Sequence, residues 1–284
     1  MKKSIALISF VIISLLGLGQ NYKPIYLWPG LVPGETGSKH EPVQTPNKDR
    51  NVIRLTDVTN PAFFVFKPSK ENNNGAGMVI CPGGGYSILA FDLEGTEIAE
   101  WLTKQGFTAF VLQYRVPKKQ EEALMDVQRA IRLIRNGAAS FGIQPNKLGV
   151  MGFSAGGSLS ARASTLYEKK SYSPVDKSDS ASCRPDFTLL IYPAYLDLGT
   201  NRALTPELIV NKGTPPMFIF ATADDNYSNS ALVITTALRD AKVPVEMHLL
   251  AKGGHGYGLR TGNIAGETWP KLAEIWLKNI VGDK

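Results

Sequence analysis

A serine with a glycine two residues before it and two residues after it lies between an apolar run and a helix-compatible segment. The run Gly152-Phe153-Ser154-Ala155-Gly156 follows LGVM and precedes SLSARAS. This G-x-S-x-G pattern is typical of a nucleophilic serine on a sharp turn from strand to helix, which glycines permit because they have no Cβ. Taken alone, the motif is equally consistent with a Gly-rich turn capped by a serine, so its interpretation depends on partner residues.

A second glycine motif strengthens the interpretation. The segment Pro82-Gly83-Gly84-Gly85-Tyr86 directly follows the apolar run MVIC. Glycine loops of the HGGG type at this position let backbone N–H groups approach the substrate carbonyl and stabilise its oxyanion. With Pro82 in the place of the histidine, Gly84 and Gly85 are the candidate donors. The N–H of Ala155, at the start of a helix, is the third.

A nucleophilic serine requires a general base, and the chain contains three histidines. His40 lies in the N-terminal lead-in, and His248 lies inside the apolar run VEMHLL, where its side chain is expected to point to a sheet face. His255 follows that run in a Gly-rich loop before the last helical segment. The chain order Ser, Asp, His therefore favours His255 as the base.

Two adjacent carboxylates are candidates for the third member. Asp224 and Asp225 follow the apolar run MFIFATA, and either one can accept the Nδ1 proton of His255 and stabilise the imidazolium. Asp225 is preferred because it follows Pro216 by nine residues, which leaves room for a strand to end. Asp224 remains an alternative, since the ends of elements are poorly defined by sequence.

These residues require a scaffold that brings the ends of several strands together. Short apolar runs alternate with segments in which apolar residues recur every three to four positions. The alternation predicts an α/β fold with a mainly parallel sheet covered by helices on both faces, and ligands then bind beyond the carboxyl ends of the strands. The expected strands are FFVF, MVIC, FTAFVLQY, LGVMGF, FTLLIYP, MFIFATA and VEMHLL, with a further strand at 51–56; the expected helices are 94–105, 120–139, 154–167, 228–241 and 269–280.

The beginning of the chain has the pattern of a secretory signal peptide. Two lysines precede an apolar run from Ile5 to Leu18, and a cut is expected between Gly19 and Gln20. An uncleaved anchor is the alternative. We therefore expect a signal peptide over residues 1–19, a secreted or periplasmic location and no membrane contact beyond the signal. The strands and helices named above are expected to form one α/β-hydrolase domain over 20–284.

Composition and charge narrow the function classes. The net charge of +6 falls to +4 without Lys2 and Lys3, and the other basic residues are interleaved with acidic ones, which does not favour nucleic-acid binding. No H-x-x-x-H pair or cysteine cluster is present, so neither a metal nor another cofactor is expected. Cys81 and Cys183 specify no disulfide framework, and Cys81 is expected in a buried strand.

Three other features have a less definite interpretation. Tyr86 is a candidate for lining the acyl pocket, because aromatic side chains commonly line ligand sites. Arg129, Arg132 and Arg135 recur every three residues, and we expect a solvated helix face or ion pairs with Asp126. The polar segment 167–185 is expected to be a surface excursion; a flap over the site is the alternative.

Together these motifs resemble a family of α/β-hydrolase esterases. The runs CPGGGYSILAFDLEGTEIAEWL, QYRVP, DVQRAIRLIR, FGIQPNKLGVMGFSAGG, LLIYPAYL and KVPVEMHLLAKGGHGYGL are similar to those of acetylxylan esterases and feruloyl-esterase-like carbohydrate esterases, from about Trp28 to the C-terminus. The resemblance implies a Ser154, Asp225, His255 triad and an oxyanion hole of Gly84, Gly85 and Ala155. The loop DDNYSNSA is shorter than the family's usual turn after the acid, which leaves the choice of aspartate open.

The resemblance also implies a serine carboxylesterase acting on small O-acyl groups, most simply acetyl, on xylan or another carbohydrate. The substrate partner is then a small-molecule or polysaccharide ester. An exopeptidase or lipase-like hydrolase on the same fold is one alternative, and a non-catalytic carbohydrate-binding homologue is another. The oligomeric state and the acyl group are not specified by the sequence.

Overall fold

The computed structural model describes residues 23–46 and 50–282. The expected signal peptide and its cut lie outside the described residues. Within the described ranges, no helix is both long enough and apolar enough to span a membrane.

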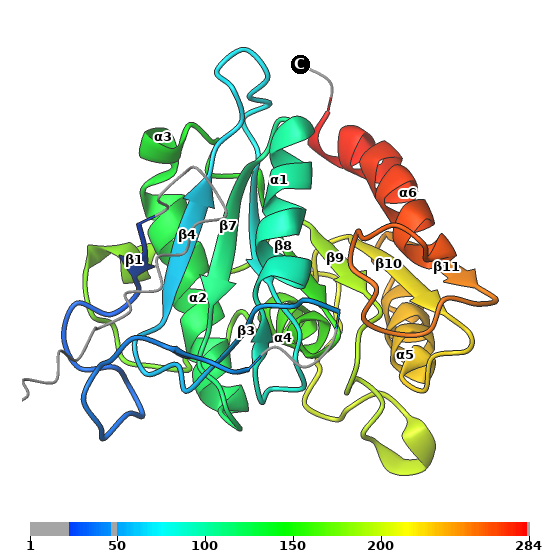
Figure 1. Cartoon of the computed structure of the whole chain (residues 1–284), viewed down its shortest axis with the longest axis horizontal. Coiled ribbons are helices and arrows are strands. Elements are labelled where there is room, and N and C mark those ends of the chain that lie inside the picture. The colour runs from blue at the N-terminus through cyan, green and yellow to red at the C-terminus, as the bar shows by residue number, and fades with distance from the viewer. Residues whose placement is uncertain (1–22, 47–49, 283–284) are drawn as a thin grey trace, which may run out of the picture.

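The described chain alternates strands and helices in the expected order (Figure 1). The strands are β1 (Ile25–Tyr26), β2 (Val43–Gln44), β3 (Arg54–Thr56), β4 (Ala62–Phe66), β5 (Gly77–Cys81), β6 (Leu89–Ala90), β7 (Thr108–Gln113), β8 (Leu148–Phe153), β9 (Thr188–Ile191), β10 (Met217–Thr222) and β11 (Val245–Leu250). The α-helices are α1 (Glu97–Lys104), α2 (Gln120–Asn136), α3 (Ala138–Phe141), α4 (Ala155–Thr165), α5 (Ser228–Asp240) and α6 (Ile264–Val281). A π-helical turn (Asp92–Thr96) and two 3-10 turns (Lys177–Ser180 and Thr200–Arg202) complete the set.

Eight strands form the central sheet in the order β1-β4-β7-β5-β8-β9-β10-β11. The pairs from β7 to β11 are parallel, whereas β1 and β4 join the edge as antiparallel strands. Strands β5, β8, β9 and β10 are fully buried, as their uninterrupted apolar runs predict. The sheet is therefore mainly parallel, as the alternation of strands and helices predicted.

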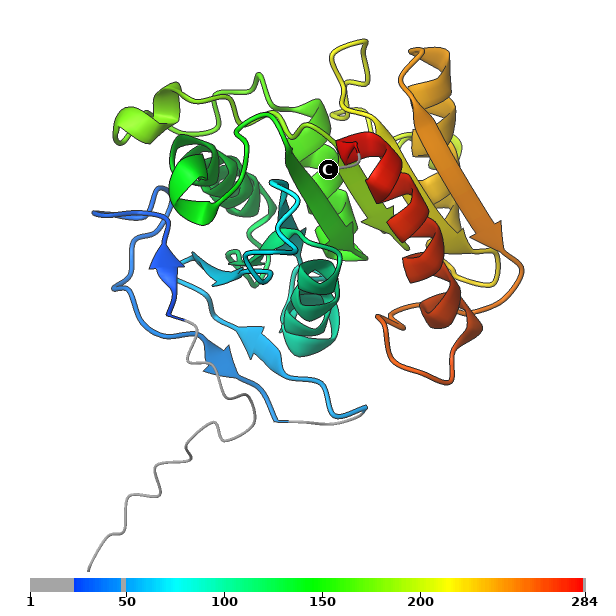
Figure 2. The ribbon, with the colours of Figure 1, turned by 90° about the horizontal axis from the view of Figure 1, so that it is seen from above.

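Helices cover both faces of the sheet (Figure 2). Alternate residues along the strands divide between the faces: Val79, Val150 and Leu112 pack with α2 and α4, and Ile80, Met151 and Phe218 pack with α1 and α6. Helix α5 lies on the same face as α4, against residues of β10. This two-sided burial leaves the carboxyl ends of the strands as the place where polar loops gather.

Two helices differ most from their expected ranges. The last helix begins at Ile264, five residues before the expected start, because the Asn263 side chain accepts hydrogen bonds from the N–H groups of Ala265 and Gly266. Pro270 is thus inside the helix rather than at its start. The expected helix 120–139 is two helices, separated at Gly137.

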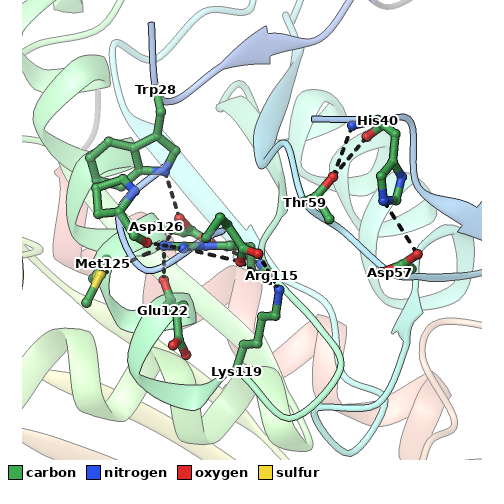
Figure 3. A network of polar contacts seen from close by, with 11 residues as sticks. Trp28, His40, Asp57, Thr59, Arg115, Lys119, Glu122, Met125 and Asp126 are labelled. Atoms are coloured by element: carbon green, nitrogen blue, oxygen red, sulfur yellow. Dashed lines mark hydrogen bonds and ion pairs between the residues drawn. The ribbon is translucent and has the colours of Figure 1, made fainter. Parts of the chain in front are cut away.

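A buried ion pair fixes α2 to the end of β7 (Figure 3). Asp126 accepts hydrogen bonds from the Arg115 guanidinium at 2.9 Å, from the Arg115 N–H at 3.0 Å and from Trp28 Nε1 at 2.9 Å. Both charged side chains are fully shielded from solvent. Because four bonds satisfy the carboxylate, the cost of burying it is offset, and the N-terminal lead-in is held to the sheet through Trp28.

The arginines of α2 form neither the expected solvated face nor the expected ion pairs with Asp126, because Asp126 is taken by Arg115 and the arginine side chains are buried or half-buried. Arg129, Arg132 and Arg135 instead reach the polar segment 167–185 and its end. Their partners are Asp176 and Asp179 for Arg129, Tyr172 for Arg132 and Asp186 for Arg135. The segment is a surface excursion, as expected, but it is fixed to α2 and contributes nothing to the hollow over Ser154.

Candidate active site

Ser154 lies on the turn between β8 and α4 in a strained backbone conformation. Its φ of 51° and ψ of −118° are rare for a residue with a side chain. A Cβ at Gly152 would lie 2.0 Å from the Gly156 carbonyl oxygen, and one at Gly156 would lie 1.9 Å from the carbonyl oxygen of Cys81. Only glycine fits at both positions, so the motif makes the turn and leaves the serine hydroxyl above the sheet.

The structure brings Ser154, His255 and Asp225 together in a chain of hydrogen bonds. His255 Nε2 is 2.7 Å from Ser154 Oγ, and His255 Nδ1 is 2.6 Å from Asp225 Oδ2. The Asp225 side chain is almost fully buried, and its other oxygen accepts the N–H of Tyr227 at 2.9 Å. This geometry lets His255 take the serine proton while Asp225 holds the ring in one tautomer.

Asp224 has a different environment from its neighbour. It accepts hydrogen bonds from the N–H groups of Gly254 at 2.9 Å and Gly253 at 3.2 Å. Those two N–H groups lower the pKa of its carboxyl. The geometry therefore places Asp225 against the imidazole, and it places Asp224 where it orders the glycine loop that carries His255.

The candidate oxyanion donors lie near Ser154: Gly84 and Gly85 line the same hollow, and Ala155 is the next residue of the chain, at the start of α4. Gly84 and Gly85 have φ values of 132° and 64°, which turn the loop after β5 toward Ser154. In the part of the chain that the structure describes, the N–H groups of Gly84, Gly85 and Ala155 have no acceptor. Three unpaired donors beside the nucleophile are suited to a carbonyl oxygen that gains negative charge.

A hollow opens above these residues at the carboxyl ends of the strands. Its lining includes Gly84, Gly85, Ser154 and His255, together with Arg50 and Arg54 of the lead-in and the rings of Tyr195 and Tyr227. Tyr86 does not line this hollow, in contrast to its expected role. Its ring is buried and packs edge-on against Tyr114, because the turn directs it away from the Ser154 side of the loop.

Comparison with known proteins gives the family. The BD-FAE family model matches residues 64–186. A solved structure of an acetyl ester-xyloside bifunctional hydrolase from Caldicellulosiruptor lactoaceticus is 30% identical, with a TM-score of 0.76, and the match covers 91% of this chain and 96% of that one. The chain belongs to the α/β-hydrolase esterases.

Two further esterases are similar to this chain, one over a shorter share of its own length and one at lower identity. An acetylxylan esterase of Xylanibacter ruminicola is 30% identical over 268 residues, which is 85% of this chain and 53% of that protein. The chain thus spans about half the length of this relative. A thermophilic esterase from Thermogutta terrifontis, 22% identical with a TM-score of 0.68 over 79% of this chain and 89% of that one, shares the fold.

The other two histidines of this α/β-hydrolase lie away from the triad. His40 is exposed in the lead-in, with Nε2 3.5 Å from Asp57 Oδ2 (Figure 3). His248, on edge strand β11, hydrogen bonds to Glu246 and packs on Phe218. Neither is within reach of Ser154.

The described residues contain neither a disulfide between the two cysteines nor a cluster of metal-ligating side chains. Cys81 and Cys183 are free and buried, and burial raises the pKa of Cys81 to about 12. Residues 23–46 and 50–282 contain no group of three or more His, Cys, Asp or Glu side chains placed to hold a metal ion.

A buried carboxyl group that the sequence did not single out supports the glycine loop of this esterase fold. Glu94 Oε2 accepts the N–H of Gly83 at 2.8 Å, and Glu94 Oε1 accepts the hydroxyl of Tyr192 at 2.8 Å. The Tyr192 oxygen in turn accepts the N–H of Gly258 at 3.1 Å. Burial raises the pKa of Glu94, whereas these hydrogen bonds lower it. Glu94 thus joins the oxyanion loop to the loop that carries His255.

We expect Glu94→Gln to lower kcat roughly 10- to 100-fold with little change in KM. The amide keeps one acceptor oxygen but presents N–H groups to the other partner, so one bond is lost and the donor loop shifts. Steady-state kinetics on 4-nitrophenyl acetate measure the effect. Glu100→Gln, six residues further along at an exposed position of α1, is the matched control. Equal kinetics for the two variants would exclude the positioning role.

Proposed function

We propose that the chain is a serine carboxylesterase that hydrolyses small O-acyl esters, mainly acetyl, on xylan or another carbohydrate. The observation that carries the proposal is the hydrogen-bonded chain from Ser154 through His255 to Asp225 beside three unpaired backbone donors. Relatives named as an acetylxylan esterase and an acetyl ester-xyloside hydrolase support the substrate class.

The proposed reaction proceeds in two steps. Ser154 Oγ attacks the ester carbonyl as His255 Nε2 takes its proton, and the N–H groups of Gly84, Gly85 and Ala155 stabilise the oxyanion. The imidazolium then protonates the leaving alcohol, which departs and leaves an acyl-serine. Water, deprotonated by His255, attacks the acyl carbon and releases the carboxylic acid and the free serine.

Export is part of the proposal. The pattern of residues 1–19 supports a secreted or periplasmic location, where a polysaccharide substrate is found. N-terminal sequencing of protein recovered from the medium or periplasm tests it, with Gln20 as the expected first residue.

A panel of esters tests the substrate class. We expect kcat/KM to fall at least tenfold from the acetyl to the octanoyl 4-nitrophenyl ester, because a site for small acyl groups does not bury the additional methylene groups of the longer chain. We also expect release of acetate from acetylated xylan. Methyl ferulate is the aromatic comparison in the same panel. A preference for the octanoyl ester would contradict the proposal.

A further inference from the structure

A second hollow adjoins the one over Ser154, on the other side of the oxyanion loop. The two hollows share Gly85 and Tyr195. The second is lined by Tyr86 beneath the loop, by Ser158 and Arg162 on α4, and by Glu121 and Glu207 at its rim. A ligand that enters both hollows would have one group at Ser154 and a neighbouring group beside Arg162.

Charged and hydroxyl side chains dominate this second hollow. Ser158 and Arg162 are both 4% exposed, yet they line it. Arg162 Nε lies 2.8 Å from Glu207 Oε1, and the same guanidinium pairs with Glu121. The Glu121 and Glu207 side chains are 54% and 41% exposed, so their carboxylates retain acceptor capacity toward the hollow.

Tyr86 places a buried hydroxyl beneath this hollow, beside Ser158 and Arg162. Within the described chain, that hydroxyl makes no hydrogen bond of standard geometry. Burial raises the pKa of Tyr86 to about 12, so the group remains a proton donor at neutral pH. Its backbone is held at a φ of 54°, a strained value for tyrosine, with its carbonyl accepting the N–H of Lys118 at 2.7 Å. Such an unpaired group is costly unless a ligand or solvent completes it.

The chemistry of the lining selects the kind of ligand. An acyl chain would place methylene groups against a guanidinium and two carboxylates and leave their hydrogen-bonding capacity unused. A sugar ring supplies several hydroxyl groups, each a donor and an acceptor. The half-buried ring of Tyr195 and the exposed side chain of Leu198, 66% accessible, offer apolar surface for its C–H face. The two carboxylates are balanced by two cations, because Arg162 pairs with both of them and Lys169 pairs with Glu121. A lining without net charge favours a neutral sugar over a charged one.

We propose that this hollow, between the oxyanion loop and the rim carboxylates Glu121 and Glu207, is a glycosyl subsite. It binds the neutral sugar residue next to the one that carries the ester. The inference rests on the proposed function and extends it, because it assigns part of the specificity to residues outside the catalytic hollow. Binding here places the ester of a polysaccharide over Ser154, whereas a small synthetic ester gains nothing from it.

The test compares two substrates in one preparation: acetylated xylotetraose and 4-nitrophenyl acetate. We expect Glu207→Gln to lower the ratio of their kcat/KM values about tenfold, mainly through KM for the oligosaccharide, since a charged acceptor is replaced. Glu274→Gln, a carboxylate paired with Lys278 on α6, is the matched control and should keep the parent ratio. Leu198→Ala, which leaves the ion pairs intact, should lower the ratio about threefold through lost apolar contact.

Two outcomes would overturn the subsite. One is a ratio in Glu207→Gln and Leu198→Ala equal to that of the parent. The other is a proportional loss on both substrates, which would mean that the residues only support the fold. If the parent cleaves 4-nitrophenyl acetate but not acetylated xylotetraose, the proposed carbohydrate specificity fails instead. Calorimetric binding of xylotetraose to Ser154→Ala, with and without Glu207→Gln, then decides the subsite directly, and absence of binding rejects it.

Discussion

Replacing Ser154 by alanine is expected to abolish ester hydrolysis, with a fall in kcat of about 10⁶-fold on 4-nitrophenyl acetate. The acyl-serine cannot form, and the remaining donors act only on a direct attack by water. Only the hydroxyl is lost, while the backbone turn and the packing of α4 are retained. The thermal unfolding midpoint should therefore stay close to that of the parent. Initial rates and differential scanning fluorimetry measure the two quantities.

Ser87→Ala provides the matched control for this substitution. Ser87 is an exposed serine that follows the glycine loop. Its N–H donates to the Gly84 carbonyl, and its hydroxyl makes one long, exposed hydrogen bond of 3.4 Å to the Gly85 carbonyl. Its hydroxyl can be removed without touching the triad, so the rate should remain within about twofold. A fluorophosphonate probe adds a second readout, since it should label the parent and Ser87→Ala but not Ser154→Ala. Hydrolysis by Ser154→Ala at the parent rate would reject the nucleophile.

The features that the sequence predicted well are local or ordered along the chain. Strands β5, β8 and β10 are uninterrupted apolar runs, so their identity depends on their own residues. Ser154 and His255 follow strand ends, where the topology of a parallel sheet brings residues together. The two glycines of the turn indicate its conformation directly, because a Cβ at position 152 or 156 would overlap a backbone carbonyl oxygen.

The features that the sequence missed depend on contacts between distant residues. Glu94 and Tyr192 are 98 residues apart, and nothing in an acidic residue near a helix start indicates a carboxyl buried beneath the oxyanion loop. The sequence could have indicated Tyr192 as a candidate site residue, because it directly follows β9 at the carboxyl edge of the sheet. Arg129 was expected to be solvated or to pair with Asp126 on its own helix because spacing indicates only near neighbours, whereas its partners lie 47 and 50 residues away. Tyr86 was expected to line the acyl pocket, and its place outside the hollow over Ser154 depends on the path of the glycine loop, which the sequence does not specify.

Asp224 and Asp225 are adjacent in the sequence, but only one of them contacts the imidazole of His255. Asp225 is buried and meets the imidazole, while Asp224, its neighbour, is exposed and meets backbone N–H groups. Sequence reasoning favoured Asp225 but could not separate the two, because both end the same strand. The turn after β10 separates them: the Tyr227 N–H binds Asp225 Oδ1 and directs its Oδ2 to His255.

We therefore expect Asp225→Asn to lower kcat about 10⁴-fold. The Asn amide group can donate to His255 Nδ1 and so favours the tautomer with the proton on Nε2, which cannot accept the proton of Ser154. It also removes the negative charge that stabilises the imidazolium. Steady-state kinetics on 4-nitrophenyl acetate at neutral pH measure the loss, and fluorophosphonate labelling should slow in parallel because the serine is no longer activated.

Asp224→Asn is the matched partner of that experiment. Its amide oxygen can still accept one of the two N–H groups from Gly253 and Gly254, so the glycine loop is weakened but the imidazole keeps its carboxylate. We expect a loss of less than about tenfold. A larger loss in Asp224→Asn than in Asp225→Asn would reverse the assignment.

The pH dependence of the Asp224 contact follows from its pKa. Because hydrogen bonds from the N–H groups of Gly253 and Gly254 lower the pKa of Asp224, acidification protonates this carboxyl only below the usual carboxyl range, and the loop contact is lost as pH falls through that lowered value. At mildly acidic pH the parent should therefore keep the hydrogen bonds from Gly253 and Gly254 to Asp224, whereas Asp224→Asn weakens them at every pH. The ratio of the parent rate to the Asp224→Asn rate should stay constant until the pH falls below the usual carboxyl range.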